Sequence, residues 1–421
     1  MARKSKELMN VIELFDEEDF IEEIEELPID AQFIVDFYEN ASYIVDYRKE
    51  GAVIHSVESI ILSVIFAILA KCNTFVEIHL FMIEHFEWLN EHIKFEFGLP
   101  SLSTIKRVIG FVNPKELEQV CVETFKSFLV QNKPLFKKGT FIVEDIKTMD
   151  GKTANASDRQ SSKEGKIKKM NAMSVYSVKN NYCESTEFIA NKTNEIPTGV
   201  ELLKKINIKD SIVVFDAMST QTDTIKYIIE KDGHYVAPVK GNQSTLEECI
   251  KEYFSDPKLY EQAKNESYYE VKEKSHGSFE KREYIFTNDV DWIYKKKDWI
   301  GLKSIGLAKR TYEKDGKIIT DIRYYISDLD AKEIEIISKA IRSEWAIENQ
   351  LHWYLDMVFL EDNNRCFLNN SQKNLNIIRK FCLSLLKLYK ERTKLSMNSI
   401  RHVISMNFER NIEDIINTLY N

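Results

Sequence analysis

The chain has 421 residues, 43% of them hydrophobic and 30% charged, which is enough for about two or three domains with buried cores. Its longest apolar run, residues 60–70, is too short for a membrane helix, and its six cysteines show neither a CxxC pair nor zinc-site spacing. These properties exclude a membrane protein and a disulfide-stabilised secreted domain, and they predict a cytoplasmic protein with reduced thiols.

The first 40 residues form a predicted acidic N-terminal arm. They contain 13 acidic and 3 basic side chains, so the net charge of this segment is −10. Because the net charge of the whole chain is −9, the remaining residues together have a net charge of +1. A near-neutral body can still present a basic face to a nucleic acid. The arm is therefore either a solvated segment or a cover for a basic DNA groove.

Residues 41–135 have the pattern of a helical domain. Hydrophobic spacing predicts helices over residues 56–71 and 74–89, and Ser101 or Ser103 is a suitable N-cap for a third helix.

The third helix has one predicted apolar face. Lys106 and Arg107 fall outside that face, where they either contact DNA phosphates or are only solvated. The predicted buried residues are Ile105, Val108, Ile109 and Val112.

The pattern changes near residue 136, where the first part of a mixed α/β core begins and continues to residue 245. Two of its predicted strands end in an aspartate followed by a small residue, Asp150-Gly151 and Asp216-Ala217. Strand ends are where α/β cores build their sites. The predicted strands cover residues 140–150, 172–178, 186–190, 211–216 and 235–239, with a polar loop over 157–169 and a helix over 198–206.

Residues 246–330 alternate in a β manner and form a predicted β-rich insertion. Helical spacing returns over residues 331–395 as the second part of the core, and residues 396–421 are a predicted C-terminal tail. Glu348 lies on this last helix, and His352 follows four residues later on the same face.

Three carboxylates converge if the helix packs across the two strands, namely those of Asp150, Asp216 and Glu348. Such a cluster is unfavourable unless cations bind, and its hard oxygen ligands suit Mg²⁺ or Mn²⁺. Two such ions about 4 Å apart stabilise the attacking and leaving oxygens of a phosphoryl transfer. Taken alone, each acid is more often a turn, cap or solvated residue.

The residues around these acids form an ordered set of motifs. The acids lie in Met149–Thr153, in Asp216–Met218 with Gln221, and in a block from Trp345 to Asp362. This set resembles the bacterial insertion-sequence transposases of the ISAs-one group, which includes the H-repeat-associated proteins. The further motifs are PSxxTxxRV at residues 100–108, KTNEIP at 192–197, KGNQ at 240–243, and His276-Gly277 with Glu280 and Arg282.

The resemblance implies an RNase H-like catalytic core with a β-rich insertion, preceded by a helical DNA-binding domain. It implies that Asp150, Asp216 and Glu348 are catalytic and hold two Mg²⁺ or Mn²⁺ ions for DNA cleavage and strand transfer. The implied partners are the terminal inverted repeats of an insertion sequence and target DNA, bound by a homodimer or a higher assembly on the nucleoid. The alternatives are a catalytically silent DNA-binding protein derived from a transposase, and a metal-dependent nuclease that does not rejoin strands.

Further candidates for DNA contact surround the acids, and each has a structural alternative. Lys240 is either a phosphate contact or a turn residue, His352 positions a phosphate or Glu348 or is structural, and Arg342 contacts DNA or forms an ion pair. Trp345 and Trp353 are expected in the core rather than as base-stacking groups. The remaining candidates for DNA contact are Lys152, Asn242 and Gln243.

Three positions depart from the family pattern. Ser278 and Asn155 stand where arginine is usual, and Glu344 stands where histidine is usual. All three changes make the region less positive, while the three acids are kept.

Overall fold

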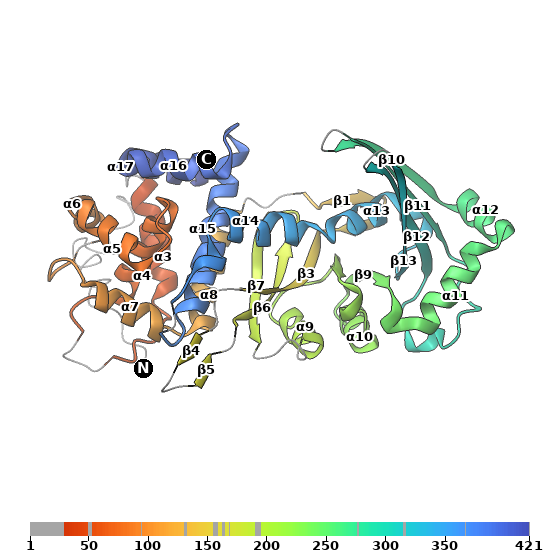
Figure 1. Ribbon diagram of the computed structural model, residues 1–421, viewed down its shortest axis with the longest axis horizontal. Helices are drawn as coiled ribbons and strands as arrows, with labels where there is room; N and C mark the ends of the chain where they lie inside the picture. Colours follow the sequence, from red (N-terminus) through yellow and green to blue (C-terminus); the bar gives the residue numbers. More distant parts are fainter. Residues whose placement is uncertain are drawn as a thin grey trace.

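The computed structural model describes residues 29–48, 53–93, 95–129, 133–154, 159–161, 165–167, 169–189, 195–275, 278–314, 317–366 and 368–420. Most of the predicted acidic arm, much of the polar loop, Asn155, His276 and Gly277 lie outside these ranges. Within them, no helix combines the length and the apolar character needed to cross a bilayer. Figure 1 shows helices gathered at one end, a large sheet in the middle, and a curved group of strands with two helices at the other end.

Serine side chains cap two of the N-terminal helices, and Ser101 is one of the two caps that the sequence offers for α7. The Ser56 side chain accepts a hydrogen bond from Ser59 N at the start of α4, and Ser101 does the same for Thr104 N at the start of α7. The helices of this part are α3 (Ile29–Ala41), α4 (Val57–Leu69), α5 (Phe75–Glu84), α6 (Phe86–Ile93), α7 (Leu102–Phe111) and α8 (Pro114–Ser127).

The single helix expected over residues 74–89 is wrong, because the chain bends between α5 and α6. His85 has left the helical conformation, with φ −106° and ψ 23°. The bend brings the rings of Phe81 and Trp88 to 4.8 and 5.0 Å from the ring of Phe408. Aromatic packing on both sides of the bend thus overrides a continuous helix.

The C-terminal residues complete this helical part. Residues 396–421, expected to be a tail, instead include α16 (Met397–Met406) and α17 (Phe408–Tyr420). The long helix α15 (Ser371–Glu391) packs against α4, α7 and α8 and also against the sheet (Figure 1). Helices α3 to α8 and the C-terminal helices α15 to α17 therefore share one hydrophobic core.

Nine of the described strands form one sheet in the order β10-β11-β12-β13-β9-β8-β3-β6-β7, and β1 with β2 and β4 (Arg159–Ser161) with β5 (Gly165–Ile167) form two small sheets. The centre of the nine-stranded sheet is parallel, since β8 pairs in parallel with both β3 and β9. The strands are β3 (Asp145–Thr153), β6 (Asn171–Ser177), β7 (Tyr182–Ile189), β8 (Ser211–Phe215), β9 (His234–Val239), β10 (Tyr268–Ser275), β11 (Ser278–Thr287), β12 (Ser304–Lys314) and β13 (Lys317–Ser327).

The strand expected over residues 140–150 is two strands. A short β2 (Phe141–Val143) pairs with β1 (Phe136–Lys138), and β3 begins only at Asp145. Between them, the Glu144 amide donates a hydrogen bond to the carbonyl of Asp210. The pairing of β2 with β1 is thus followed by the pairing of β3 with β8.

The predicted β-rich insertion continues the main sheet rather than forming a separate one. Two helices come first, α11 (Ser244–Ser255) and α12 (Pro257–Glu266). Strands β10 to β13 then form an antiparallel meander, whose last strand pairs with β9.

Helices cover both faces of the sheet. Along β8, Ile212 and Val214 share a core with α13 (Ile334–Ser343), whereas Val213 and Phe215 face α9 (Glu195–Leu203) and α10 (Thr222–Glu230). This alternation is the two-residue period of a strand buried on both sides.

The helical spacing expected over residues 331–395 corresponds to several separate helical segments. After α13 come a π-helical segment, Glu348–His352, and α14 (Trp353–Met357), and then the chain turns at Leu360, which has a positive φ of 51°. The turn reverses the chain so that α15 can leave the sheet and enter the helical part.

Candidate active site

Asp150 and Asp216 come directly after the last pair of the parallel β3–β8 ladder; Asp216 follows the end of β8, whereas Asp150 lies within β3, which continues to Thr153 in its pairing with β6. In the β3–β8 register, Met149 lies opposite Phe215, so the two aspartates leave the same edge of the sheet side by side. Neighbouring strands lie about 4.8 Å apart. Asp150 Oδ1 accepts a hydrogen bond from the Gly151 amide at 2.8 Å, and the other carboxylate oxygen stays available.

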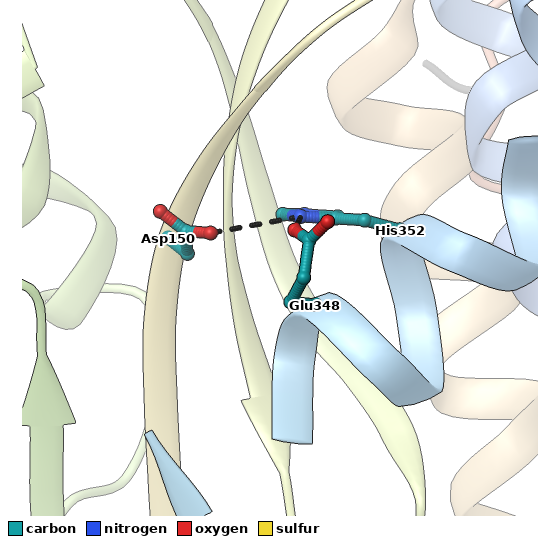
Figure 2. Close-up of side chains that lie close together, drawn as sticks. All are labelled: Asp150, Glu348 and His352. Atoms are coloured by element: carbon teal, nitrogen blue, oxygen red, sulfur yellow. Dashed lines mark hydrogen bonds and ion pairs between the residues drawn. The ribbon is translucent and has the colours of Figure 1, made fainter. Parts of the chain in front are cut away.

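Glu348 and His352 come to this edge from the π-helical segment (Figure 2). His352 Nδ1 lies 3.0 Å from Glu348 Oε2 and 3.6 Å from Asp150 Oδ2. The histidine side chain is 4% exposed, whereas that of Glu348 is 54% exposed. Ligand atoms of these three residues lie within 4.8 Å of one another, so together they could hold a metal ion.

The carboxylate of Asp216 is directed elsewhere. Its Oδ1 accepts a hydrogen bond from Ser219 N at 3.0 Å and so caps the short 3₁₀ turn Ala217–Ser219. The candidate metal-binding group among the described residues therefore contains His352 in the place where the sequence suggested Asp216. Asp216 remains near enough for its charge to raise the pKa of Asp150.

The charges of the site favour a bound cation. Burial raises the pKa of Asp150, and the neighbouring carboxylates of Asp216 and Glu348 raise it further, although His352 opposes them. The hydrogen bond from His352 lowers the pKa of Glu348, with help from the charge of Lys152. Two carboxylates and an imidazole are ligands that Mn²⁺ accepts, and the carboxylates also suit Mg²⁺.

Two of the predicted DNA contacts are held in ion pairs. Lys152 Nζ lies 2.5 Å from Asp356 Oδ2, and Arg342 Nη2 lies 2.8 Å from Glu273 Oε2. Lys152 thus links the strand of Asp150 to the helix that follows Glu348. For Arg342, the ion pair weighed as the structural alternative is present.

The KGNQ turn is joined to the turn that follows Asp216. Asn242 Nδ2 donates to the Ala217 carbonyl at 2.6 Å, and Gln243 Nε2 donates to the Thr220 carbonyl at 3.0 Å. Both amides therefore support the backbone beside Asp216. Lys240, at the start of the same turn, has an exposed side chain.

Lys106 and Arg107 lie on α7, in the N-terminal helical part, and do not belong to the acid–histidine group. The four residues expected on the buried face of this helix are buried. The expectation that Trp345 and Trp353 belong to the core is wrong, since they are 52% and 50% exposed.

Of the three departures from the family pattern, Glu344 has a described side chain. It lies 3.3 Å from both Arg323 Nη1 and the Tyr325 hydroxyl. Burial raises its pKa, and the charge of Asp216 adds to this effect. The side chains of Ser278 and Asn155 lie outside the described part of the chain.

Lys387 is a buried contact of the site that the sequence did not suggest. From α15 it donates to the carbonyl of Gln350, in the π-helical segment, and to the hydroxyl of Tyr176, each at 2.6 Å. The sequence offers little signal for this role, because the lysine stands in a helix with many other charged residues.

Comparison with known proteins identifies the family to which the chain is similar. A family model described as the transposase DDE domain matches residues 142–385, and one described as associated with that domain matches residues 39–124. The protein YncI of Escherichia coli O157:H7 is 31% identical over 82% of this chain and 86% of its own. The H repeat-associated protein YhhI of E. coli K12 is 30% identical over 83% of this chain and 89% of its own.

Among solved structures, a piggyBac transposase in a synaptic complex with hairpin DNA aligns with 94% of this chain and 86% of its own. The sequence identity is 11% and the TM-score is 0.40, which is too low to establish a common fold. The family match, by contrast, spans more than half of the chain and includes all three acids of the ordered motifs. The chain therefore belongs to the DDE transposase family, and the protein is a DNA transposase.

Proposed function

We propose that the protein cuts DNA at the ends of an insertion sequence and joins the freed 3′ ends to target DNA, using Mg²⁺ or Mn²⁺. The observation that carries this proposal is the group of Asp150, Glu348 and His352, with ligand atoms within 4.8 Å of one another in a chain of the DDE family. Bound divalent ions would supply the charge that stabilises the attacking and leaving oxygens of an in-line phosphoryl transfer.

The three acids are the proposed metal ligands, and His352 is the residue proposed to position one of them. Asp150 and Glu348 offer carboxylate oxygens toward a shared point, and His352 holds the Glu348 carboxylate through its Nδ1. Asp216 leaves the adjacent strand and is proposed as the further carboxylate of a two-ion site. The Ser219 amide holds Oδ1 of that carboxylate, so Oδ2 is the oxygen proposed as the ligand atom.

The wider organisation is also part of the proposal. We assign an RNase H-like core to residues 136–245 and 331–395, a β-rich insertion to 246–330, and a DNA-recognising helical domain to 41–135. The parallel strands β3, β8 and β9, with helices on both faces, support this core. Terminal inverted repeats and target DNA are the proposed partners, engaged by a homodimer or larger assembly on the nucleoid.

The test uses a duplex that carries the inverted repeat from the DNA flanking the gene. Wild type should nick this duplex with Mn²⁺ or Mg²⁺ and transfer a labelled 3′ end into a plasmid. Asp150→Asn should lose both reactions while keeping its DNA affinity. Asp223→Asn, an exposed aspartate on α10, is the matched control and should retain both.

Other results of this experiment would support one of the two alternative functions or contradict the assigned site. Nicking without transfer would identify a metal-dependent nuclease. DNA binding without either reaction in wild type would identify a catalytically silent protein. Equal nicking by wild type and Asp150→Asn would refute the site.

A further inference from the structure

A cationic cavity lies beside the segment that carries Glu348. It has a volume of about 390 Å³ and is bounded by strands β11, β12 and β13, by the end of α13 and by the residues that follow it. This volume falls within the range of about 300 to 1,000 Å³ that is usual for small-ligand sites. Its lining includes Trp345, Asn349 and Gln350, which flank Glu348 in the chain, and Glu344, which is near enough to Asp216 for that charge to raise its pKa.

Three arginines of the cavity gather around one buried carboxylate. Glu280, 6% exposed, is ion-paired to Arg282 and to Arg310, whose Nη2 lies 2.6 Å from Glu280 Oε2. Arg342 Nη1 lies 3.8 Å from the other oxygen of Glu280. Arg342 also pairs with Glu273, and Asp321 lies opposite Arg310 in the β12–β13 register. The lining has five cationic side chains, Arg282, Lys309, Arg310, Arg323 and Arg342, and two acidic ones, Asp321 and Glu344, so the lining itself is cationic.

The exposure of these arginines fits recognition of an anion. The side chains of Arg310 and Arg342 are 42% and 41% exposed, although both contact the buried Glu280. Both side chains are thus held near Glu280, and Arg310 also lies over the Tyr312 ring, while about two fifths of each side chain stays exposed. Fixed guanidinium groups suit phosphate oxygens, because little side-chain entropy is lost when a bidentate contact forms.

An aromatic ring stands at the same cavity. Trp345 is 52% exposed, and the guanidinium of Arg323 lies 5.5 Å from its ring centroid. An exposed indole beside several cations is the combination that proteins use to hold single-stranded nucleic acid, where bases stack on aromatic rings and arginines contact phosphates. Apolar ligands are poorly matched, because charged and polar groups dominate the lining.

We propose that this cavity binds an unpaired nucleotide of the DNA strand that enters the active site. The base stacks on Trp345, and the adjacent phosphates contact Arg310 and Arg342. This inference rests on the proposed function, since it takes the substrate to be DNA, but it concerns binding and does not require that cleavage occurs.

The test measures binding without divalent metal, so that failure of the proposed chemistry cannot affect it. The probe is a duplex with a short single-stranded overhang that carries 2-aminopurine, and a blunt duplex is the reference. Trp345→Ala should weaken binding of the overhang duplex about tenfold and abolish the fluorescence change on binding, with less than about a twofold effect on the blunt duplex. Trp345→Phe should restore most of the binding, which separates stacking from a fold defect.

Two further variants test the charge and its position. Arg310→Ala should also weaken binding of the overhang duplex severalfold, whereas Arg410→Ala, which removes an exposed arginine of α17, should leave it unchanged. The mononucleotide dAMP should compete poorly, because it lacks the flanking phosphates. Wild-type affinity of Trp345→Ala and Arg310→Ala for the overhang duplex would overturn the proposal. Displacement by dAMP as strong as by the oligonucleotide would overturn the assignment to a strand.

Discussion

Lys152 on β3 and Asp356 on α14 form an ion pair with 2.5 Å between Nζ and Oδ2, although they are 204 residues apart. The lysine side chain is 11% exposed and the aspartate 31%, so the pair is largely shielded from water. It joins the strand of Asp150 to the helix that follows Glu348. Removing one partner leaves a partly buried charge without compensation.

Lys152→Met is therefore expected to lower the free energy of unfolding by about 1 to 3 kcal/mol, as measured by urea denaturation. Asp356→Asn should have a similar effect, and the double variant should be less destabilised than the sum of the two. The pair Lys204–Glu201 has a similar Nζ–Oε1 distance of 2.6 Å, but its side chains are 49% and 62% exposed. Lys204→Met should leave the stability unchanged, and equal effects at the two pairs would contradict the argument.

His352 is expected to control metal affinity through Glu348. Its ring is buried, and Nδ1 contacts both carboxylates, so its loss frees the Glu348 side chain to rotate. His352→Asn should raise the Mn²⁺ concentration for half-maximal DNA nicking about 10- to 100-fold. This concentration does not depend on the fraction of folded enzyme. His402→Ala, on the exposed side of α16, is the control, and an unchanged Mn²⁺ requirement for His352→Asn would argue against the role.

Sequence patterns predicted the local features of this protein well. The Ser101 cap, the buried face of α7 and the end of β8 just before Asp216 follow from rules that act over a few residues. The strand end expected at Asp150 is wrong, because pairing with β6 extends β3 to Thr153. Features that depend on distant partners could not be predicted in this way. The bend at His85 depends on Phe408, and the helical C-terminus depends on a core supplied by the N-terminal helices.

The active site likewise has some features that the sequence predicts and others that depend on distant residues. The order of the three acids was visible in the sequence, but the capping bond that turns the Asp216 carboxylate toward Ser219 was not. Exposure of Trp345 was also missed, because an aromatic residue at helical spacing usually packs in a core. Its exposure depends on the cavity that distant strands create beside it.

In the KGNQ turn, a substitution of Asn242 is expected to lower the stability of the fold, whereas a substitution of Lys240 is expected to lower the affinity for DNA. Asn242→Ala removes the 2.6 Å hydrogen bond to the Ala217 carbonyl and should lower the free energy of unfolding by about 1 kcal/mol. Lys240→Ala removes an exposed charge, so the stability should not change, while the affinity for duplex DNA should fall. If Lys240 contacts one phosphate, the slope of log affinity against log salt should also decrease by about 1. A stability loss in Lys240→Ala with unchanged DNA affinity would reverse this assignment.

Lys387 is expected to make stability depend on pH. Burial lowers its pKa to about 7, with a contribution from the charge of Lys390, while Cys183 acts in the opposite direction. In the unfolded chain a lysine titrates near a pKa of about 10.4. Between these two values the unfolded state binds more protons than the folded state, so folding becomes more favourable as the pH rises.

The measurement compares urea denaturation of wild type and Lys387→Met at pH 7 and pH 9. Over this interval wild type should gain about 2 kcal/mol relative to the variant, because the neutral amine no longer resists burial. Lys394→Met, an exposed lysine beyond the end of α15, should follow wild type at both pH values. A constant difference between wild type and Lys387→Met would mean that the buried lysine keeps its proton. The carbonyl of Gln350 and the hydroxyl of Tyr176 would then be accepting hydrogen bonds from a charged group, and the π-helical segment of Glu348 would be held by a buried cation.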